Sequence, residues 1–584
     1  MTSRMPRVFL LVLLTGVCLA SLANSAGTGC PCEPAGPLDV RDPYLQRLYD
    51  LTYDQKPPLP APGSYGIDPA TGKMVHPKAT PLVQDAPNFA GQLDYWDQES
   101  YASNMRVLAF YPHLVSPFHT WQNIVDFGKR RYLYVYDWDN MSIFDITEPA
   151  RGKLVLRKGV QWNAEGPTNR QNPFEPQRRP GAATVQWHRG LDKLLLIQSF
   201  ENRRIGVLED KSREPDAVQR LRRADHWKGF RIYEMTGPLP DEWRLLSETT
   251  TDRRNPDALL GEQEGSGSLD VPVYYGGRYL FVAAAPDDSY SLTEYPDYLY
   301  SPGYQAWDLQ DPAKPEFVGK LTVPGQIVGD PAHEDAYLMN PRAGNRTSWM
   351  GARMPLFLPQ PHEQGGKLAF AAMAGLGLYT VDISDPADMR TLGHLSLPPK
   401  FGGTEADNVD TTQYSRTGHV FMNGYPMNDE CFEPYKDIFV IDAKNPADPR
   451  VVATFPRPMP PARAKFTDYC QRRGSFGPKR PGYYTQPGRG RDGVSIYAFY
   501  NAGVQVFDVG DPTKPSIAAY YVPRFPKSGE VMESAYGNLA YGVYVEYDRN
   551  VVWLFTNHGI YALATPVLGE PASGVPARSW PYRD

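Results

Sequence analysis

One phrase recurs along this chain: an apolar strand ends in an aspartate, the backbone turns at a proline, and a second strand follows. In GVQVFDVGDPTKPSIAAYY (503–521), the first strand ends at Asp508 and the turn falls at Asp511-Pro512. Similar phrases occupy 134–155, 303–321, 377–395 and 437–455, and a degenerate copy occupies 229–246. Proline fixes φ and cannot donate a backbone hydrogen bond, so each copy must break between two strands. The phrase predicts a repeated strand–turn–strand unit.

More strand-forming sequence precedes each copy, as hairpins with polar or Gly-rich turns such as QNIVDFGKRRYLYVYD. Each unit then has four antiparallel strands, A to D. A last unit at 539–564 has only three, and the segment 105–113 supplies the missing outer strand. We therefore predict an all-β fold, a single seven-bladed β-propeller over 105–566 that is closed by an N-terminal strand. Two tandem β-sandwiches would not explain the recurrent turn.

Composition agrees with this fold class. The 584 residues include 37 Tyr, 58 Pro and 51 Gly, and aromatic strands separated by many turns are typical of all-β proteins. The formal net charge of −6 is small for this length, so a nucleic-acid partner is not indicated.

The N-terminus predicts export. Arg4 and Arg7 precede the apolar run VFLLVLLTGVCLASLA, and small residues follow it, so 1–25 is interpreted as a signal peptide. The run is too short for a membrane-spanning helix, and we expect no integral span after its removal. The mature protein is then periplasmic or secreted. Residues 26–104 form a Pro-rich N-terminal arm, and 567–584 form a C-terminal tail.

Four cysteines remain after signal removal: Cys30, Cys32, Cys431 and Cys470. An even number in an oxidising compartment predicts disulfides. Two arrangements are open. Either Cys431 pairs with Cys470, or two long bridges join these loops to the arm.

The loops carry the functional prediction. In an up-and-down blade, the B–C loops and the D-to-A connections share one face, and nearly all the long segments are of these two kinds. We therefore expect long loops on one face, over an axial pocket. His119, His333 and His558 are expected at that face, with carboxylates that include Asp407 and Asp410. Converging imidazoles would bind a transition metal (Zn, Cu or Fe) or act as catalytic acid and base. The alternative for each histidine is a hydrogen-bonded turn residue.

Aromatic residues crowd the same predicted face. Tyr295 and Tyr298 lie in one loop, and Trp349 with Arg353 lies in the next connection. With Asp407 they form the predicted binding set, because aromatic rings beside an arginine suit sugars, aromatic acids or peptides. They also suit a β-elimination in which the arginine neutralises a carboxylate. The alternative is that these loops pack on themselves.

The run from Tyr500 to Asp508 (YNAGVQVFD) and the phrase DISDP at 382–386 resemble the LVIVD-repeat β-propellers, a family of exported bacterial and archaeal proteins. The resemblance covers roughly 105–565 and implies the propeller fold, but no particular activity. In GSFGPKRP (474–481), relatives often carry histidine where Lys479 stands, and this departure weakens a metal role at that blade.

Two functions remain open on these grounds. The first is an enzyme that acts on a small-molecule or sugar-like substrate, with a His-bound metal. The second is a non-catalytic module of the cell envelope that binds a ligand or a protein. No HExxH, GxSxG, P-loop or GxGxxG motif in its proper context is present, which disfavours zincin, α/β-hydrolase and nucleotide-binding folds.

Overall fold

The computed structural model of the protein describes residues 66–67, 74–75, 99–112, 121–136, 140–159, 179–201, 229–251, 267–268, 273–285, 302–327, 351–352, 354–395, 404–426, 436–466, 469, 472, 475–482, 490–525, 540–577 and 580–581.

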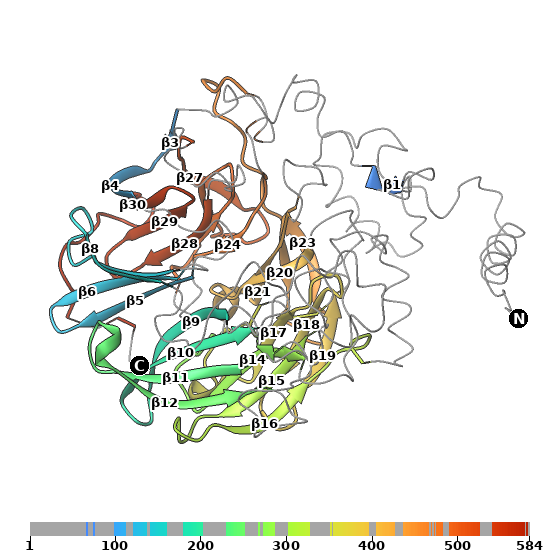
Figure 1. The fold of residues 1–584 in the computed structure, drawn as a ribbon. Helices are drawn as coiled ribbons and strands as arrows, with labels where there is room; N and C mark the ends of the chain where they lie inside the picture. The colour runs from blue at the N-terminus through green and yellow to red at the C-terminus, as the bar shows by residue number, and fades with distance from the viewer. Residues whose placement is uncertain are drawn as a thin grey trace, which may run out of the picture.

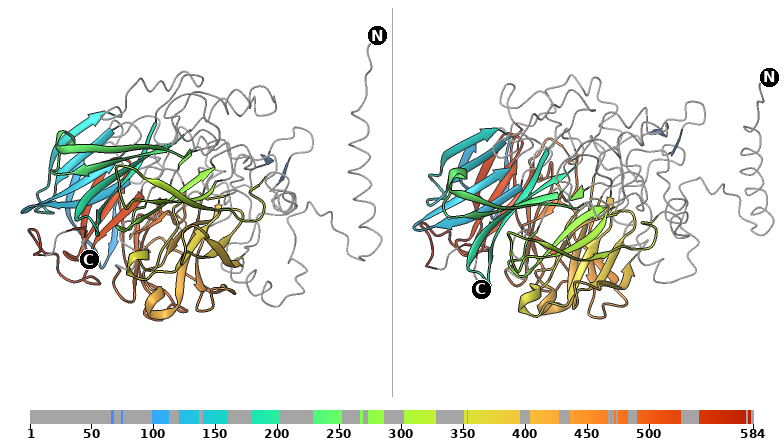
Figure 2. Two further views of the ribbon diagram at one scale, coloured as in Figure 1. Left: turned by 90° about the horizontal axis from the view of Figure 1, so that it is seen from below. Right: turned by 60° about the horizontal axis from the view of Figure 1, so that its bottom comes forward.

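These residues are almost all β, and their small antiparallel sheets form a ring of seven blades (Figures 1 and 2). In blades 1 to 6, strands A to D follow the chain outward from the axis, as a repeated unit of consecutive hairpins requires. The predicted seven-bladed propeller is confirmed.

From the axis outward, the first three blades contain β5 (Trp121–Phe127), β6 (Arg130–Tyr136), β7 (Asn140–Asp145) and β8 (Lys153–Gly159); β9 (Arg179–His188), β10 (Lys193–Glu201), β11 (Gly229–Met235) and β12 (Trp243–Thr250); β13 (Gly267–Ser268), β14 (Tyr279–Ala285), β15 (Gly303–Asp308) and β16 (Glu316–Leu321). The next four contain β17 (Leu368–Ala372), β18 (Leu378–Asp382) and β19 (Arg390–Leu395); β20 (Thr404–Asp410), β21 (His419–Tyr425), β22 (Ile438–Asp442) and β23 (Arg450–Thr454); β24 (Arg480–Pro481), β25 (Val494–Ala498), β26 (Val504–Asp508) and β27 (Ser516–Val522); β28 (Ala540–Glu546), β29 (Val551–Thr556) and β30 (Gly559–Ala564).

Isolated bridges also occur on the inner side of two blades, in blade 3 in addition to β13 and in blade 4 in place of a fourth strand. In blade 3, Val273 pairs with Phe281, and in blade 4, Phe357 pairs with Phe370. Outside the blades, β1 (Gly66–Ile67) pairs with β2 (Met74–Val75). Short helices occur at η4 (Pro240–Glu242), η5 (His362–Gln364) and α7 (Tyr414–Thr417). Among the described residues, no helix has the length and apolar character needed to span a membrane.

The ring closes as predicted. Strand β4 (Arg106–Pro112) pairs antiparallel with β30 and is the outer strand of blade 7, so the blue strand β4 and the red strand β30 lie side by side in Figure 1. One strand was not foreseen. The short strand β3 (Tyr101–Ser103), within the range expected for the arm, pairs with β27 and adds a fifth strand to blade 6.

Every blade carries the same irregularity between its third and fourth strands. The pairing of the third and fourth strands shifts by one residue, which leaves one extra residue on the outer strand. The extra residues are apolar: Val155, Leu246, Val318, Leu392, Val452, Ala518 and Leu108. Such β-bulges increase local twist and make an outer strand a poorer template for edge-to-edge pairing.

In blades 4 and 5, the C–D turn that precedes the bulge packs on the preceding blade. The carbonyl of Pro446 accepts a hydrogen bond from Thr380, and a Cβ at Gly393 would lie 2.3 Å from the same oxygen. Gly319 approaches Pro386 in the same way, at 2.6 Å. At these two positions glycine allows the close approach, because a side chain would push the turn of the next blade away.

Candidate functional site

The strand directions define two faces of the ring. At one face the innermost strands begin and the B–C hairpins turn, and we call it the loop-bearing face. The segments 160–178, 202–228, 252–266, 286–301, 328–350 and 526–539 all start and finish at strand ends on this face. At the opposite, short-turn face lie compact Asx turns, in which for example the Asp382 and Asp385 carboxylates accept backbone N–H groups two residues on. The predicted asymmetry of loop length thus corresponds to the two faces of the fold.

His558 lies at the loop-bearing face, in the hairpin between β29 and β30. It is 4 % exposed and packs against the rings of Phe110 and Tyr561, at centroid distances of 5.4 and 5.8 Å. Its Nε2 lies 3.0 Å from the Tyr561 hydroxyl, and its Nδ1 lies 3.2 Å from Asn557 Oδ1. The Asn557 oxygen can only accept, so the network assigns the proton to Nδ1 and makes Nε2 the acceptor from Tyr561.

This environment is that of a buried, hydrogen-bonded turn histidine. A metal needs the lone pair of a ring nitrogen, and the lone pair of Nε2 is directed at the Tyr561 hydroxyl. The described part of the chain contains no group of three His, Cys, Asp or Glu side chains that would hold a metal ion. His119 and His333 lie outside the described residues, as do Tyr295, Tyr298, Trp349 and Arg353. The histidine site and the aromatic binding set remain predictions.

Asp407 is the member of the predicted binding set that the structure describes. It lies on β20, the innermost strand of blade 5, and is 2 % exposed. One carboxylate oxygen accepts a hydrogen bond from the neighbouring Asn408. Asn408 Nδ2 also donates to the Lys479 carbonyl at 3.0 Å, and Asn423 Nδ2 lies 3.5 Å from the same oxygen. Buried polar groups therefore join the innermost strands of blades 5 and 6.

A corresponding interblade contact shows which hydrogen bond is missing at Asn408. Between blades 1 and 2, Asn123 Nδ2 donates to the Ala183 carbonyl at 2.8 Å, and its Oδ1 accepts the Val185 N–H at 3.1 Å. The residue two positions after Lys479 is Pro481, which has no N–H to donate. Asn408 Oδ1 is accordingly a buried acceptor that receives no hydrogen bond from the described residues, and Asn423 Oδ1 is another.

Buried cations also occur at the loop-bearing ends of blades 5 and 6. Four are between 1 and 4 % exposed: Lys436, Arg472, Lys479 and Arg480. The Arg472 guanidinium donates to the carbonyls of Asn501 and Pro523, at 2.7 and 3.0 Å. A fifth cation, Arg457, is ion-paired with Asp437 at 2.7 Å. Burial of positive charge is costly unless polar partners compensate it, and the two carbonyls are such partners of Arg472.

Asp410 corrects one prediction. Because β20 runs from Thr404 to Asp410, this carboxylate lies at the short-turn end of the strand and not at the loop-bearing face. It accepts hydrogen bonds from the hydroxyls of Ser495 and Thr412, both at 2.6 Å. Burial raises the pKa of Asp410, although these hydrogen bonds oppose the rise. The group is structural, because it joins the turns of blades 5 and 6.

A family model matches the chain at residues 365–395, and its description is the LVIVD repeat. The chain carries an LVIVD repeat. The LVIVD repeat coincides with β17, β18 and β19 of blade 4, including the DISDP turn from which the resemblance was inferred. A comparison with curated proteins finds no match.

Solved structures offer only distant likenesses. A functionally unknown protein from Desulfotomaculum acetoxidans is 10 % identical, with 70 % of this chain and 84 % of that chain covered and a TM-score of 0.32. The N-terminal domain of Nup159 is 9 % identical, with 80 and 98 % covered and a TM-score of 0.37. A protein from Lactobacillus plantarum is 10 % identical, with 68 and 84 % covered and a TM-score of 0.34. TM-scores this low do not support an inference about this protein.

Sequence reasoning missed the buried cations and the amide acceptors. The run GPKRP (477–481) was considered only for the residue at position 479. One sequence signal was available. Pro481 has no N–H, so an asparagine that bonds to the backbone of this innermost strand can lose one of its hydrogen bonds.

Proposed function

We propose that the protein is an exported binding propeller that holds a small ligand bearing a carboxylate, such as an acidic sugar, at the loop-bearing ends of blades 5 and 6. The observation that carries this proposal is the group of buried cations Lys436, Arg472, Lys479 and Arg480. Cationic side chains recognise carboxylates through charge-assisted hydrogen bonds. The Oδ1 atoms of the buried amides add acceptors for ligand hydroxyls.

The binding function is favoured over the enzyme for a chemical reason. Both ring nitrogens of His558 are engaged by Tyr561 and Asn557, so this histidine is a poor metal ligand or general base in this conformation. The predicted aromatic residues of the loops would add stacking surface to a sugar site.

Binding is tested with the purified full chain by isothermal titration calorimetry. The probes are galacturonate and glucuronate, with galactose and glucose as neutral counterparts. We expect the acids to bind and the neutral sugars to bind at least tenfold more weakly, which corresponds to about 1.4 kcal/mol. Lys479→Met removes the charge but keeps the stem, and should weaken binding of the acid at least tenfold.

The matched control is Lys444→Met, because Lys444 is an exposed lysine at the short-turn face whose Nζ lies 3.4 Å from Asp442. It should bind the acid as the wild type does. Equal affinity for acidic and neutral sugars, or equal losses in both variants, would contradict the proposal. Transition metal at one ion per chain, lost in His119→Ala or His333→Ala, would instead favour the enzyme.

A further inference from the structure

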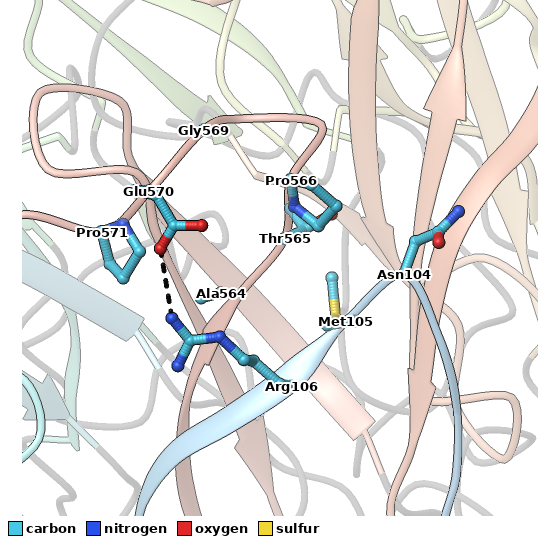
Figure 3. A pocket seen from close by; sticks show the side chains of 9 residues that line it. All are labelled: Asn104, Met105, Arg106, Ala564, Thr565, Pro566, Gly569, Glu570 and Pro571. Atoms are coloured by element: carbon cyan, nitrogen blue, oxygen red, sulfur yellow. Dashed lines mark hydrogen bonds and ion pairs between the residues drawn. The ribbon is translucent and has the colours of Figure 1, made fainter.

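After β30, the chain crosses from blade 7 to blade 1 along the short-turn face. We call residues 565–577 and 580–581 the strap. Its start packs beside β4 around a pocket of about 340 Å³ (Figure 3). There Arg106 of β4 meets Glu570 of the strap at 3.4 Å, with both side chains more than half exposed. An exposed pair of this kind contributes little stability.

The middle of the strap joins the two blades through backbone groups. The Ala572 N–H donates to the Arg549 carbonyl in blade 7, at 2.9 Å. The Gly574 N–H donates to the Thr147 carbonyl in blade 1, at 3.1 Å. Arg549 also reaches the carbonyls of Thr147 and Gly574, at 3.0 and 3.1 Å.

The tip of the strap is held most firmly. Trp580 is 2 % exposed, and its indole N–H donates to the Tyr544 hydroxyl of blade 7 at 2.7 Å. Its backbone carbonyl accepts the Asp126 N–H of blade 1, and its own N–H donates to the Asp126 carboxylate, both at 2.7 Å. Asp126 lies on β5, the innermost strand of blade 1, so the tip pairs with the edge that faces the axis.

Trp580 also covers the ion pairs of the seam. The Arg131 guanidinium lies 5.6 Å from the indole centroid and contacts Asp126 at 2.6 Å and Glu546 at 2.6 Å. The indole belongs to the apolar cluster that the two blades share, with Ile124, Trp553 and others. Removal of the indole would admit water to these charges and leave the cluster open on one side.

We infer that the strap is a latch for the seam between blades 7 and 1, and that Trp580 is the anchor that keeps it closed. When Trp580 leaves its site, the innermost strands of these two blades open locally while the other blades stay closed. The strap thereby holds this seam closed through contacts that the other blades do not share.

Hydrogen exchange on the full chain tests this latch. In Trp580→Ala we expect exchange in β5 and β28 to rise at least tenfold, while β18 and β22 on other blades remain unchanged. Ser573→Ala, at an exposed position of the same strap, should exchange as the wild type does. Unchanged exchange in β5, or an equal rise in all blades, would overturn the inference.

A second variant covers the case in which Trp580→Ala does not fold. Trp580→Phe keeps a ring in the site but loses the donor to Tyr544. We expect a smaller rise, confined to β5 and β28. A Phe variant with wild-type exchange in these strands would also overturn the inference.

Discussion

Arg131 should be among the most costly single residues to remove from this propeller. Its guanidinium is fully buried and binds Asp126 through two hydrogen bonds of 2.6 and 2.8 Å. It also binds Glu546 at 2.6 Å and Asp548 at 2.8 Å. Arg131→Met fills the space but leaves three buried carboxylates with only Arg549 opposite them. Breaking a buried pair costs about 3–5 kcal/mol, and we expect that loss in the free energy of unfolding.

The adjacent residue supplies the control. Arg130 is 67 % exposed and makes one 3.1 Å contact with Asp145, so Arg130→Met should cost about 0–1 kcal/mol. Urea titration followed by tryptophan fluorescence measures both variants. If the two losses agree within 1 kcal/mol, the ion network does not stabilise the seam.

The pH dependence of stability gives a second test of the Arg131–Glu546 ion pair. Burial raises the pKa of Glu546, but Arg549 and Arg131 outweigh burial and hold it below its usual value. The stability from Glu546 is therefore present at neutral pH and is lost as pH falls through its folded-state pKa. Without Arg131, Glu546 takes up a proton at higher pH. The deficit of Arg131→Met relative to wild type should then shrink between pH 7 and pH 4.

Three further predictions follow from separate features. Gly393→Ala should cost about 1–3 kcal/mol by urea titration, since the new methyl would meet the Pro446 carbonyl, whereas Gly190→Ala, with 3.5 Å of clearance, should be near neutral. His558→Ala should lower stability by about 1–3 kcal/mol, because it removes a buried hydrogen-bonded ring; an unchanged melting temperature would contradict this. Thiol counting on denatured, oxidised protein should find Cys431 and Cys470 bridged, to each other or to the arm, and four free thiols would refute the sequence prediction.

The blades were predictable because their signals are local. Each C–D turn follows one pattern, in which an aspartate is followed by two residues and then by Asp-Pro or its equivalent. The proline in each copy therefore marks locally where one strand ends and the next begins. The closing strand was predictable because blade 7 lacked a strand and 105–113 had the pattern to supply it; β4 spans Arg106–Pro112. Strand β3 was missed because Tyr-Ala-Ser is too short to show a period of two.

The surroundings of single side chains were not predictable to the same degree. His558 is buried by Phe110, which belongs to a strand more than 400 residues away in sequence. The burial of Lys436 and Lys479 depends on how blades 5 and 6 pack, and the sequence around each residue reads as polar loop. Asp410 was placed at the wrong end because the start of β20 could not be fixed to within a few residues.

The mixed origin of blade 7 also has a consequence for biosynthesis. On the ribosome, β4 emerges early, but its partner β30 follows β28, which begins only at Ala540. About 450 residues must be added after Pro112 before β30 is complete, which takes on the order of 20–90 s at 5–20 residues per second. For that time the nascent chain carries an unpaired strand with apolar residues such as Val107 and Leu108. The protein should therefore depend on holding factors during synthesis, and a circular permutant that places β4 after β30 should be free of that dependence.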